Sequence, residues 1–397
     1  MKILHITDNY APAGGAEYYI YSVCNELEKR GHTNIIIYSN KQDTTWQDAG
    51  RQAFLMEGIA NFNSSQNIIS KALSVVKREN PDIIYLHIIN NVLLTKELIR
   101  LKPTIQYIHN HNLYCPSAIM SNRFFRCPGK FGFLCFIFCL LCNCRGCKSP
   151  NALRRFRIVK ANLDNSKSLN ALIVASGYMK QRLINNGINA DKIFVIPYFT
   201  YPKKAYEPTA TGNMPIILFA GRVCKFKGLD YLIKALACIK QPYRLIIAGD
   251  GYYMNHIRKL AEKLRVYNNI EFLGWLNREE LENVYRRATI IVVPSVWPEP
   301  FGIVGIEAMS YAKPVVAFDT GGVREWLRDG ENGFLVPAKN VHLLSEKITE
   351  IIENKTLAEK LGEKGKMISE EKFSPQKHLN LLENIFLNLS MSEKHGL

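Results

Sequence analysis

The sequence TIIVVPSVWPEPFGIVGIEA, residues 289–308, joins an uncharged apolar run to a helical pattern through a short loop. The run at 289–294 is rich in β-branched residues, which is typical of a parallel strand buried on both faces. Helical spacing follows at 303–311, so we expect Glu299 in the loop and Glu307 about one turn into the helix. In an open α/β sheet this edge binds ligands, because helix-start N–H groups face anions and carboxylates accept hydroxyls. The stretch predicts a doubly wound α/β fold that binds an anionic, hydroxyl-rich ligand such as a nucleotide sugar, although such glutamates can also serve only as helix caps or dipole partners.

The length and composition indicate a globular chain, because 397 residues with 47% hydrophobic content suit two or three domains with full cores. The apolar run at the start is too short for a signal peptide and ends at Asp8, so we expect a first strand there. The longest uncharged apolar run, residues 131–142, is shorter than the ~20 residues that span a bilayer. Ten cysteines without an export signal are expected to stay reduced or to bind a metal. These features predict a cytoplasmic protein.

Short β-branched runs alternate with helical stretches twice along the chain, which predicts two doubly wound units. The expected strands of the first unit lie near 3–7, 34–38, 83–87, 104–108, 172–175 and 193–196. Those of the second lie near 215–220, 244–248, 270–273, 290–293, 314–318 and 333–336. We therefore divide the chain into domains at 1–200 and 201–375 and a C-terminal helix at 376–397 that packs back on the first domain. The cleft between the two units is the expected site.

The net charge of +16 is unevenly distributed. Residues 1–200 carry 24 Lys and Arg against 12 Asp and Glu, and no acidic residue occurs between Glu97 and Asp164. The basic residues of that interval surround an insertion at about 113–160, which contains the apolar and aromatic run. Such a segment can lie in an anionic membrane interface. A core helix inside a basic domain is the alternative, and nucleic acid is not an expected partner because the stacking modules that bind it are missing.

Seven cysteines crowd into the same insertion, which ends in Cys-Arg-Gly-Cys at 144–147. A two-residue gap between cysteines permits tetrahedral metal ligation. Cys115, Cys127, Cys144 and Cys147 are therefore a candidate four-thiolate zinc set. A second well-spaced pair is missing, however, and buried cysteines commonly pack as small hydrophobes. We expect the protein to need no metal or other cofactor.

Six motifs stand in order along nearly the whole chain. They are Gly14-Gly15-Ala16-Glu17, Leu27 to His32, Ile108-His109-Asn110, Gly221-Arg222 through Lys227-Gly228, Glu299 to Glu307, and Gly321 to Glu325. In these motifs the chain resembles the retaining family 4 glycosyltransferases, whose GT-B architecture sets two Rossmann-like domains around a central cleft. The resemblance implies an N-terminal domain that binds the acceptor and a C-terminal domain that binds a nucleotide sugar. Pro-Tyr-Phe at 197–199, where many members have Pro-Asn-Gly, departs from the family pattern.

The resemblance also implies a donor-binding set. Arg222 and Lys227 would face the donor diphosphate, where a guanidinium and an ammonium suit the charge of the leaving group. Glu307 would accept hydrogen bonds from the ribose hydroxyls. The alternatives are that Arg222 and Lys227 are solvated surface cations and that Glu307 only complements the helix dipole. The remaining implied donor positions are Gly14, Gly15, Phe301, Gly302, Ile303 and Val304.

Two residues are implied at the reacting sugar. Glu299 would contact the hydroxyls of the donor sugar and could stabilise an oxocarbenium-like sugar. The family's favoured picture is same-face attack, in which the departing phosphate helps to take the acceptor's proton. His109 follows an apolar strand, where it would overhang the cleft and hydrogen-bond a sugar hydroxyl. A lone histidine is more often structural, and His111 is a nearby rival.

Together these observations predict a transferase that is peripheral on the inner face of the plasma membrane. It would move a hexose-type sugar from a UDP- or GDP-sugar, with retention, to a lipid-linked or cell-surface polysaccharide acceptor. The same residues could instead serve a nucleotide-sugar epimerase or a sugar-phosphate phosphorylase, which product analysis would distinguish. A catalytically silent scaffold at the membrane is a third hypothesis, and the intact donor motifs argue against it.

Overall fold

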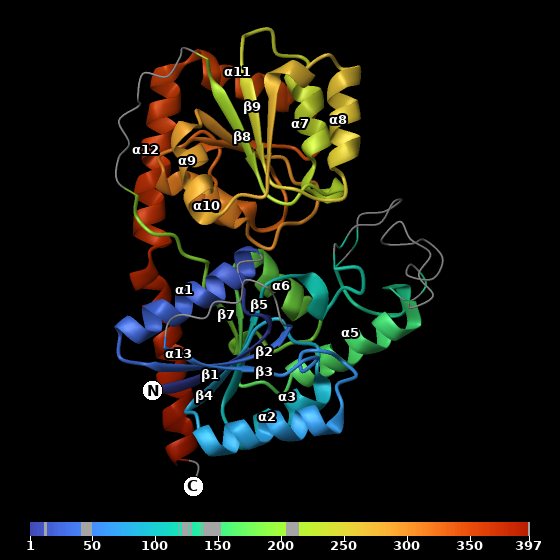
Figure 1. Ribbon diagram of the computed structural model, residues 1–397, viewed down its shortest axis with the longest axis vertical. Helices are drawn as coiled ribbons and strands as arrows, with labels where there is room; N and C mark the ends of the chain where they lie inside the picture. Colours follow the sequence, from blue (N-terminus) through green and yellow to red (C-terminus); the bar gives the residue numbers. More distant parts are fainter. Residues whose placement is uncertain are drawn as a thin grey trace. The chain divides into compact units, whose positions relative to one another are not determined.

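The computed structural model describes residues 1–11, 14–40, 50–118, 120, 127, 129–135, 137, 152–203 and 214–395 (Figure 1). The chain divides into two compact units. The first comprises Met1–Tyr198 together with Gln376–Leu397, and the second comprises Phe199–Pro375. Each unit is built on one parallel sheet, and helices follow most of its strands. The predicted class, two doubly wound Rossmann-like domains, is confirmed.

The first sheet has seven strands in the order β3-β2-β1-β4-β5-β6-β7. Their bounds are β1 Lys2–Asn9, β2 Thr33–Asn40, β3 Gln52–Leu55, β4 Ile83–Leu86, β5 Thr104–Ile108, β6 Ala171–Val174 and β7 Ile193–Val195. All neighbours pair in parallel. Six strands lie where the sequence predicts them, whereas β3 is an additional edge strand. It escapes prediction because it is only four residues long and largely exposed, so it has no apolar pattern.

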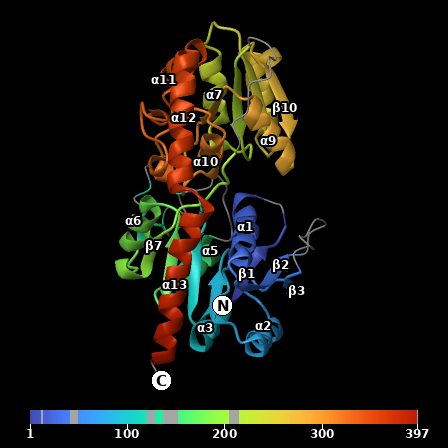
Figure 2. The same ribbon diagram turned by 90° about the vertical axis from the view of Figure 1, so that its left-hand side faces the viewer.

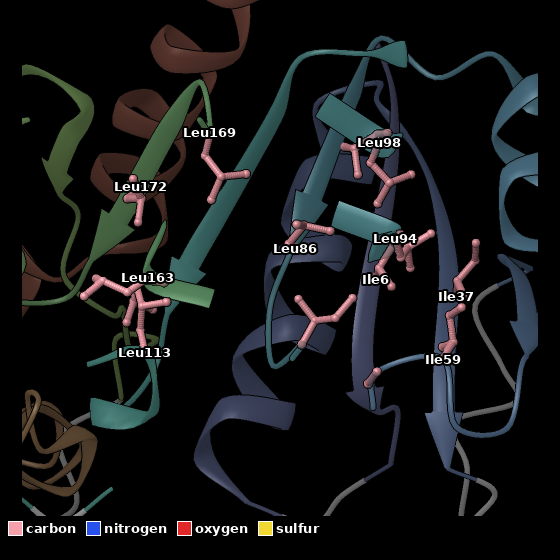
Figure 3. Packing of buried hydrophobic residues seen from close by; sticks show 14 of the residues in the cluster. Ile6, Ile37, Ile59, Leu86, Leu94, Leu98, Leu113, Leu163, Leu169 and Leu172 are labelled. Atoms are coloured by element: carbon pink, nitrogen blue, oxygen red, sulfur yellow. The ribbon is translucent and has the colours of Figure 1, made fainter. Parts of the chain in front are cut away.

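The first unit has six described helices, of which α2, α3, α5 and α6 contribute residues to an aliphatic core with the strands (Figure 3). The six helices are α1 Gly15–Lys29, α2 Gln66–Glu79, α3 Val92–Leu101, α5 Ala152–Ser166, α6 Gly177–Asn185 and α13 Pro375–His395, with 3-10 turns at His111–Leu113 and Ala190–Lys192. Ser65, Asn91 and Ser176 cap α2, α3 and α6 through their side-chain oxygens. From Gln376 onward α13 belongs to this unit (Figure 2). Its Glu383 carboxylate pairs with Arg30 at 2.6 Å and His32 at 2.9 Å.

The second sheet has six parallel strands in the order β10-β9-β8-β11-β12-β13. They are β8 Ile216–Ala220, β9 Arg244–Ala248, β10 Ile270–Gly274, β11 Ile290–Val293, β12 Val315–Phe318 and β13 Gly333–Val336, all at predicted positions. The helices are α7 Leu229–Leu236, α8 Met254–Lys263, α9 Arg278–Arg287, α10 Ile303–Ser310, α11 Val341–Glu353 and α12 Lys355–Lys372, with 3-10 turns at Lys225–Lys227, Tyr267–Asn269 and Gly321–Glu325. The strand order reverses between β8 and β11. Ligands of open α/β sheets bind at such a point.

Part of the basic insertion falls outside this description. Cys144 and Cys147, half of the candidate zinc set, lie outside the described residues, as does most of the apolar run at 131–142. Cys115 Sγ lies 3.2 Å from Ser117 Oγ, and Cys127 packs against the core. Among the residues that the structure describes, no three His, Cys, Asp or Glu are grouped to hold a metal ion. In the same part of the chain, no helix combines the length and hydropathy needed to cross a bilayer.

Candidate functional site

Two loops of the second unit meet at the point where its strand order reverses. One follows β8 and ends at Gly228, and the other follows β11 and ends at Gly302. Gly228 has a φ of 70°, and a Cβ there would lie 1.9 Å from the carbonyl oxygen of Pro294. Only glycine permits this approach. The Val296 N–H also donates to the Phe226 carbonyl at 3.0 Å, so the backbone joins the two loops.

This junction brings Lys227 onto Glu299. Lys227 Nζ lies 2.6 Å from Glu299 Oε1, and the Ser295 hydroxyl donates to the same oxygen at 2.5 Å. The Glu299 side chain is only 4% exposed, and the ammonium also lies 5.5 Å from the centre of the Trp297 ring. The family resemblance implies a phosphate contact for Lys227 and a sugar contact for Glu299, and the structure shows that the two side chains form one ion pair.

The ion pair determines the charge state of Glu299. Burial by itself would raise the pKa of this carboxyl group. The charge of Lys227 and the hydrogen bonds from Lys227 and Ser295 outweigh burial, so the pKa of Glu299 lies below its ordinary value. The carboxylate is therefore ionised at neutral pH. A buried anion of this kind can stabilise positive charge that develops on a neighbouring group.

The remaining donor positions in this loop form the start of α10. Gly302 is the N-cap residue, with a φ of 95°, and Ile303 and Val304 begin the helix. The preceding carbonyl, that of Phe301, accepts a 2.7 Å hydrogen bond from the Trp326 indole N–H. The first N–H groups of a helix have no acceptor within it, so they can bind an anion at this edge of the sheet.

Glu307 lies one turn into α10, and α9 supplies both of its side-chain partners. Arg278 Nη1 lies 2.7 Å from Glu307 Oε1, and the Tyr285 hydroxyl donates to Oε2 at 3.1 Å. Arg222, in the loop after β8, is exposed. The second unit thus positions Arg222, Lys227, Glu299 and Glu307 around the same two strand ends.

The other predicted residues lie in the first unit. Gly14 caps α1 in an extended conformation, and Gly15 begins the helix. His109 follows β5, as predicted, but its ring is enclosed: Nδ1 lies 2.7 Å from the Tyr198 hydroxyl and Nε2 lies 3.3 Å from His87 Nδ1. Burial lowers the pKa of His109 to about 3, so the ring is neutral. A sugar hydroxyl would have to replace one of these two partners.

His109 also lies on the wall of a pocket at the carboxyl ends of β4 and β5. Amide side chains, those of Asn90, Gln106, Asn162 and Asn165, make up much of the remaining wall. His111 is fully buried in the core, with Nδ1 2.6 Å from the Tyr114 hydroxyl. The geometry therefore favours His109 over His111 as the residue of this motif nearest to a ligand.

Two family models account for most of the chain. Residues 13–200 match the model described as Glycosyltransferase Family 4, and residues 203–367 match the model described as Glycosyl transferases group 1. The chain belongs to the family 4 glycosyltransferases. Its GT-B fold is also that of Anabaena HepE in complex with UDP, with a TM-score of 0.74 and 19% identity over 98% of this chain and 100% of that chain.

Curated relatives of this chain are similar over a shorter span. An uncharacterized glycosyltransferase of Methanocaldococcus jannaschii is 35% identical over 49% of this chain and 50% of its own length. The lipopolysaccharide core biosynthesis glycosyltransferase LpsE of Rhizobium meliloti is 26% identical over 54% of this chain and 61% of its own. The chain thus spans about half the length of the curated relatives it matches.

Several residues of this candidate site were not predicted from the sequence. Ser295 lies two residues beyond a predicted strand, and this position is the one feature of the sequence that could have pointed to a role in the site. Tyr198 belongs to the Pro-Tyr-Phe segment that departs from the family pattern, and its hydroxyl contacts His109. Arg278 and Tyr285 precede Glu307 by 29 and 22 residues, so only the tertiary structure reveals them.

Proposed function

We propose that the protein is a retaining glycosyltransferase that moves a hexose-type sugar from a UDP- or GDP-sugar to a lipid-linked or cell-surface polysaccharide acceptor. The observation that carries the proposal is the ion pair of Lys227 with the buried Glu299 beside the start of α10, with Glu307 one turn further along. The names of similar proteins support it, since HepE is described with UDP and glucose and LpsE with lipopolysaccharide core biosynthesis.

The proposed reaction uses each part of this site. Arg222, Lys227 and the first N–H groups of α10 neutralise the diphosphate as the bond between its oxygen and the anomeric carbon breaks. The ionised carboxylate of Glu299 stabilises the positive charge on the sugar. The acceptor hydroxyl attacks from the face that the phosphate leaves, and its proton passes to a phosphate oxygen. The new bond therefore keeps the configuration of the donor.

Thermal protection tests the donor site. The melting temperature of the purified protein is measured with UDP, GDP, ADP and CMP, and a ligand at ~100 times its Kd adds about 2.7 kcal/mol. We expect one diphosphate to protect the protein and Glu307→Ala to abolish the protection. Glu279→Ala, which removes an exposed carboxylate of α9, is the matched control and keeps it. Failure of all four nucleotides to protect would contradict the proposal.

Product analysis separates the transferase from its relatives in chemistry. The protein is incubated with membrane glycolipids and with the nucleotide sugar whose diphosphate protects it. We expect a product whose anomeric proton coupling in NMR matches that of the donor sugar. Inverted coupling would contradict retention. An epimerised nucleotide sugar formed without acceptor would instead identify an epimerase.

We also propose that α5 faces an anionic membrane, where a lipid-linked acceptor would lie. Arg154, Arg157 and Lys160 are exposed on this helix, and Leu153 is exposed beside them. Reversing the charge of Arg154 and Arg157 should weaken sedimentation with phosphatidylglycerol vesicles and leave the low binding to phosphatidylcholine unchanged. Charge reversal at two exposed lysines of α2, Lys71 and Lys77, is the control. Equal effects of the two double variants would remove the case for a membrane-binding face on α5.

A further inference from the structure

The carboxylate of Glu307 is held from two sides by a single helix. Arg278, the first residue of α9, contacts Oε1 at 2.7 Å, and Tyr285, two turns later, donates to Oε2 at 3.1 Å. The Glu307 side chain is 13% exposed. Because each oxygen has its own partner, the two contacts fix both the rotation and the position of the carboxylate.

The two partners are themselves fixed. Arg278 Nε lies 3.4 Å from Glu282, whose carboxylate is also held by Lys203 at 2.7 Å. Tyr285 is buried, and its ring stacks on Tyr311 with the centroids 5.3 Å apart and the planes 3° apart. A capping box formed by Asn277 and Glu280 fixes the start of α9. The contacts to Glu307 are therefore built into the fold before any ligand binds.

The ion pair between Arg278 and Glu307 also leaves Glu307 able to accept hydrogen bonds from a ligand. Burial by itself would lower the pKa of the Arg278 guanidinium, but the charges of Glu307 and Glu282 raise it, so Arg278 stays charged. A carboxylate offers about four acceptor positions, and Arg278 and Tyr285 occupy one on each oxygen of Glu307. One acceptor position on each oxygen remains for a pair of neighbouring hydroxyls.

We infer that Arg278 and Tyr285 are positioning residues that aim Glu307 at the two ribose hydroxyls of the donor nucleotide. The inference rests on the proposed function, because it takes Glu307 as the ribose acceptor. It adds that the discrimination between ribonucleotide and deoxyribonucleotide is set from α9, by residues that do not touch the nucleotide themselves.

A positioning role and a purely structural role predict different results. A hydrogen bond to a charged group is worth about a ten- to hundredfold change in affinity, so the wild-type protein should bind the 2′-deoxy form of its diphosphate that much more weakly. If Arg278 acts through Glu307, Arg278→Met lowers the affinity for the ribonucleotide more than that for the 2′-deoxynucleotide, which offers Glu307 only the 3′-hydroxyl. If Arg278 only supports the fold, both affinities fall by the same factor and their ratio is unchanged.

The experiment is calorimetric titration of UDP, GDP and their 2′-deoxy analogues into five proteins, with the melting temperature of each recorded. The proteins are the wild type, Arg278→Met, Arg278→Lys, Tyr285→Phe and Arg286→Met. Arg286 is the matched control, since it lies on the same helix, has the same 38% side-chain exposure and contacts the same Glu282, at 3.6 Å.

We expect the preference for the ribonucleotide to fall to about twofold or less in Arg278→Met, to recover in part in Arg278→Lys, and to stay unchanged in Arg286→Met. Tyr285→Phe, which keeps the stacked ring, should reduce the preference without lowering the melting temperature by more than a few degrees. If Arg278→Met folds poorly, Arg278→Lys and Tyr285→Phe decide the question by the same ratio.

Four results would overturn the inference. An unchanged preference in Arg278→Met and Tyr285→Phe would show that Glu307 needs no positioning. A larger preference in Arg278→Met would show that Arg278 competes with the ribose for the carboxylate. If the wild type binds no diphosphate, the proposed donor site fails, and the inference fails with it. Binding with no preference for ribose instead contradicts only the role of Glu307 and its partners.

Discussion

Acidification should destabilise the first unit far more than the second. His5 and His378 are buried there and the His109 ring is largely enclosed, and burial lowers the pKa of His5 and His378 to about 4 and that of His109 to about 3. A fourth buried histidine, His87, has its pKa lowered in the same way. These rings are therefore neutral in the folded protein at pH 5, whereas in the unfolded chain they bind protons.

The sign and size of this loss of stability follow from proton linkage. The folded pKa of each ring lies below the unfolded value of about 6.5, so its contribution is fully present above pH 6.5 and is lost as the pH falls toward 4. Each pH unit below 6.5 removes about 1.4 kcal/mol per ring, hence about 2 kcal/mol per ring at pH 5. The three rings with defined values together remove about 6 kcal/mol, a large part of the 5–15 kcal/mol that stabilises a typical protein.

Hydrogen exchange read by mass spectrometry measures this loss unit by unit. Peptides from β1, β4 and β5 report the free energy of opening of the first unit, and peptides from β8 and β11 report that of the second. Between pH 7 and pH 5 we expect the first to fall by about 6 kcal/mol and the second to change much less.

The variant His378→Asn is the control for the contribution of a single buried ring. His378 Nδ1 lies 2.7 Å from the Pro197 carbonyl and its Nε2 lies 3.0 Å from the Tyr19 hydroxyl. His378→Asn keeps a side chain of similar polarity without a titrating ring, so it lowers stability at pH 7 but reduces the further loss at pH 5 by about 2 kcal/mol. An equal loss in both units, or an unchanged loss in His378→Asn, would contradict a role for the buried histidines.

Three further predictions concern the ion pairs and the packing around the site. Lys227→Met leaves the buried Glu299 unpaired and should cost the second unit about 3 kcal/mol in chemical denaturation. Adding Glu299→Gln should restore most of it, and equal stability of the single and double variants would contradict this. Gly305→Ala places a Cβ 2.3 Å from the Trp326 ring, so we expect a loss of about 1–3 kcal/mol and an altered tryptophan emission; an unchanged spectrum would show that the ring does not move. Glu383→Gln weakens the link between α13 and the arginine and histidine after α1, and faster proteolysis of α13 than in wild type is the expected result, with equal rates counting against it.

Local patterns carried enough information to predict most of the fold. A buried parallel strand shows as a β-branched run, so all six strands of the second sheet and six of the first could be located. The edge strand β3 could not, because an exposed strand of four residues has no periodicity to detect. The positions of Glu299 in the loop and Glu307 in the helix were also predictable, since both follow from one strand and the turn after it.

The two α/β units, and the residues at the strand ends of the second, could thus be read from the order of residues along the chain. The partners of these residues became known only once the chain was folded. Lys227 lies 72 residues from Glu299, Arg278 lies 29 from Glu307, and His109 lies 89 from Tyr198. The physical reason is that strand and helix patterns depend on neighbours a few residues apart, whereas the charge state of a buried carboxylate or imidazole depends on groups that only folding brings within hydrogen-bond distance.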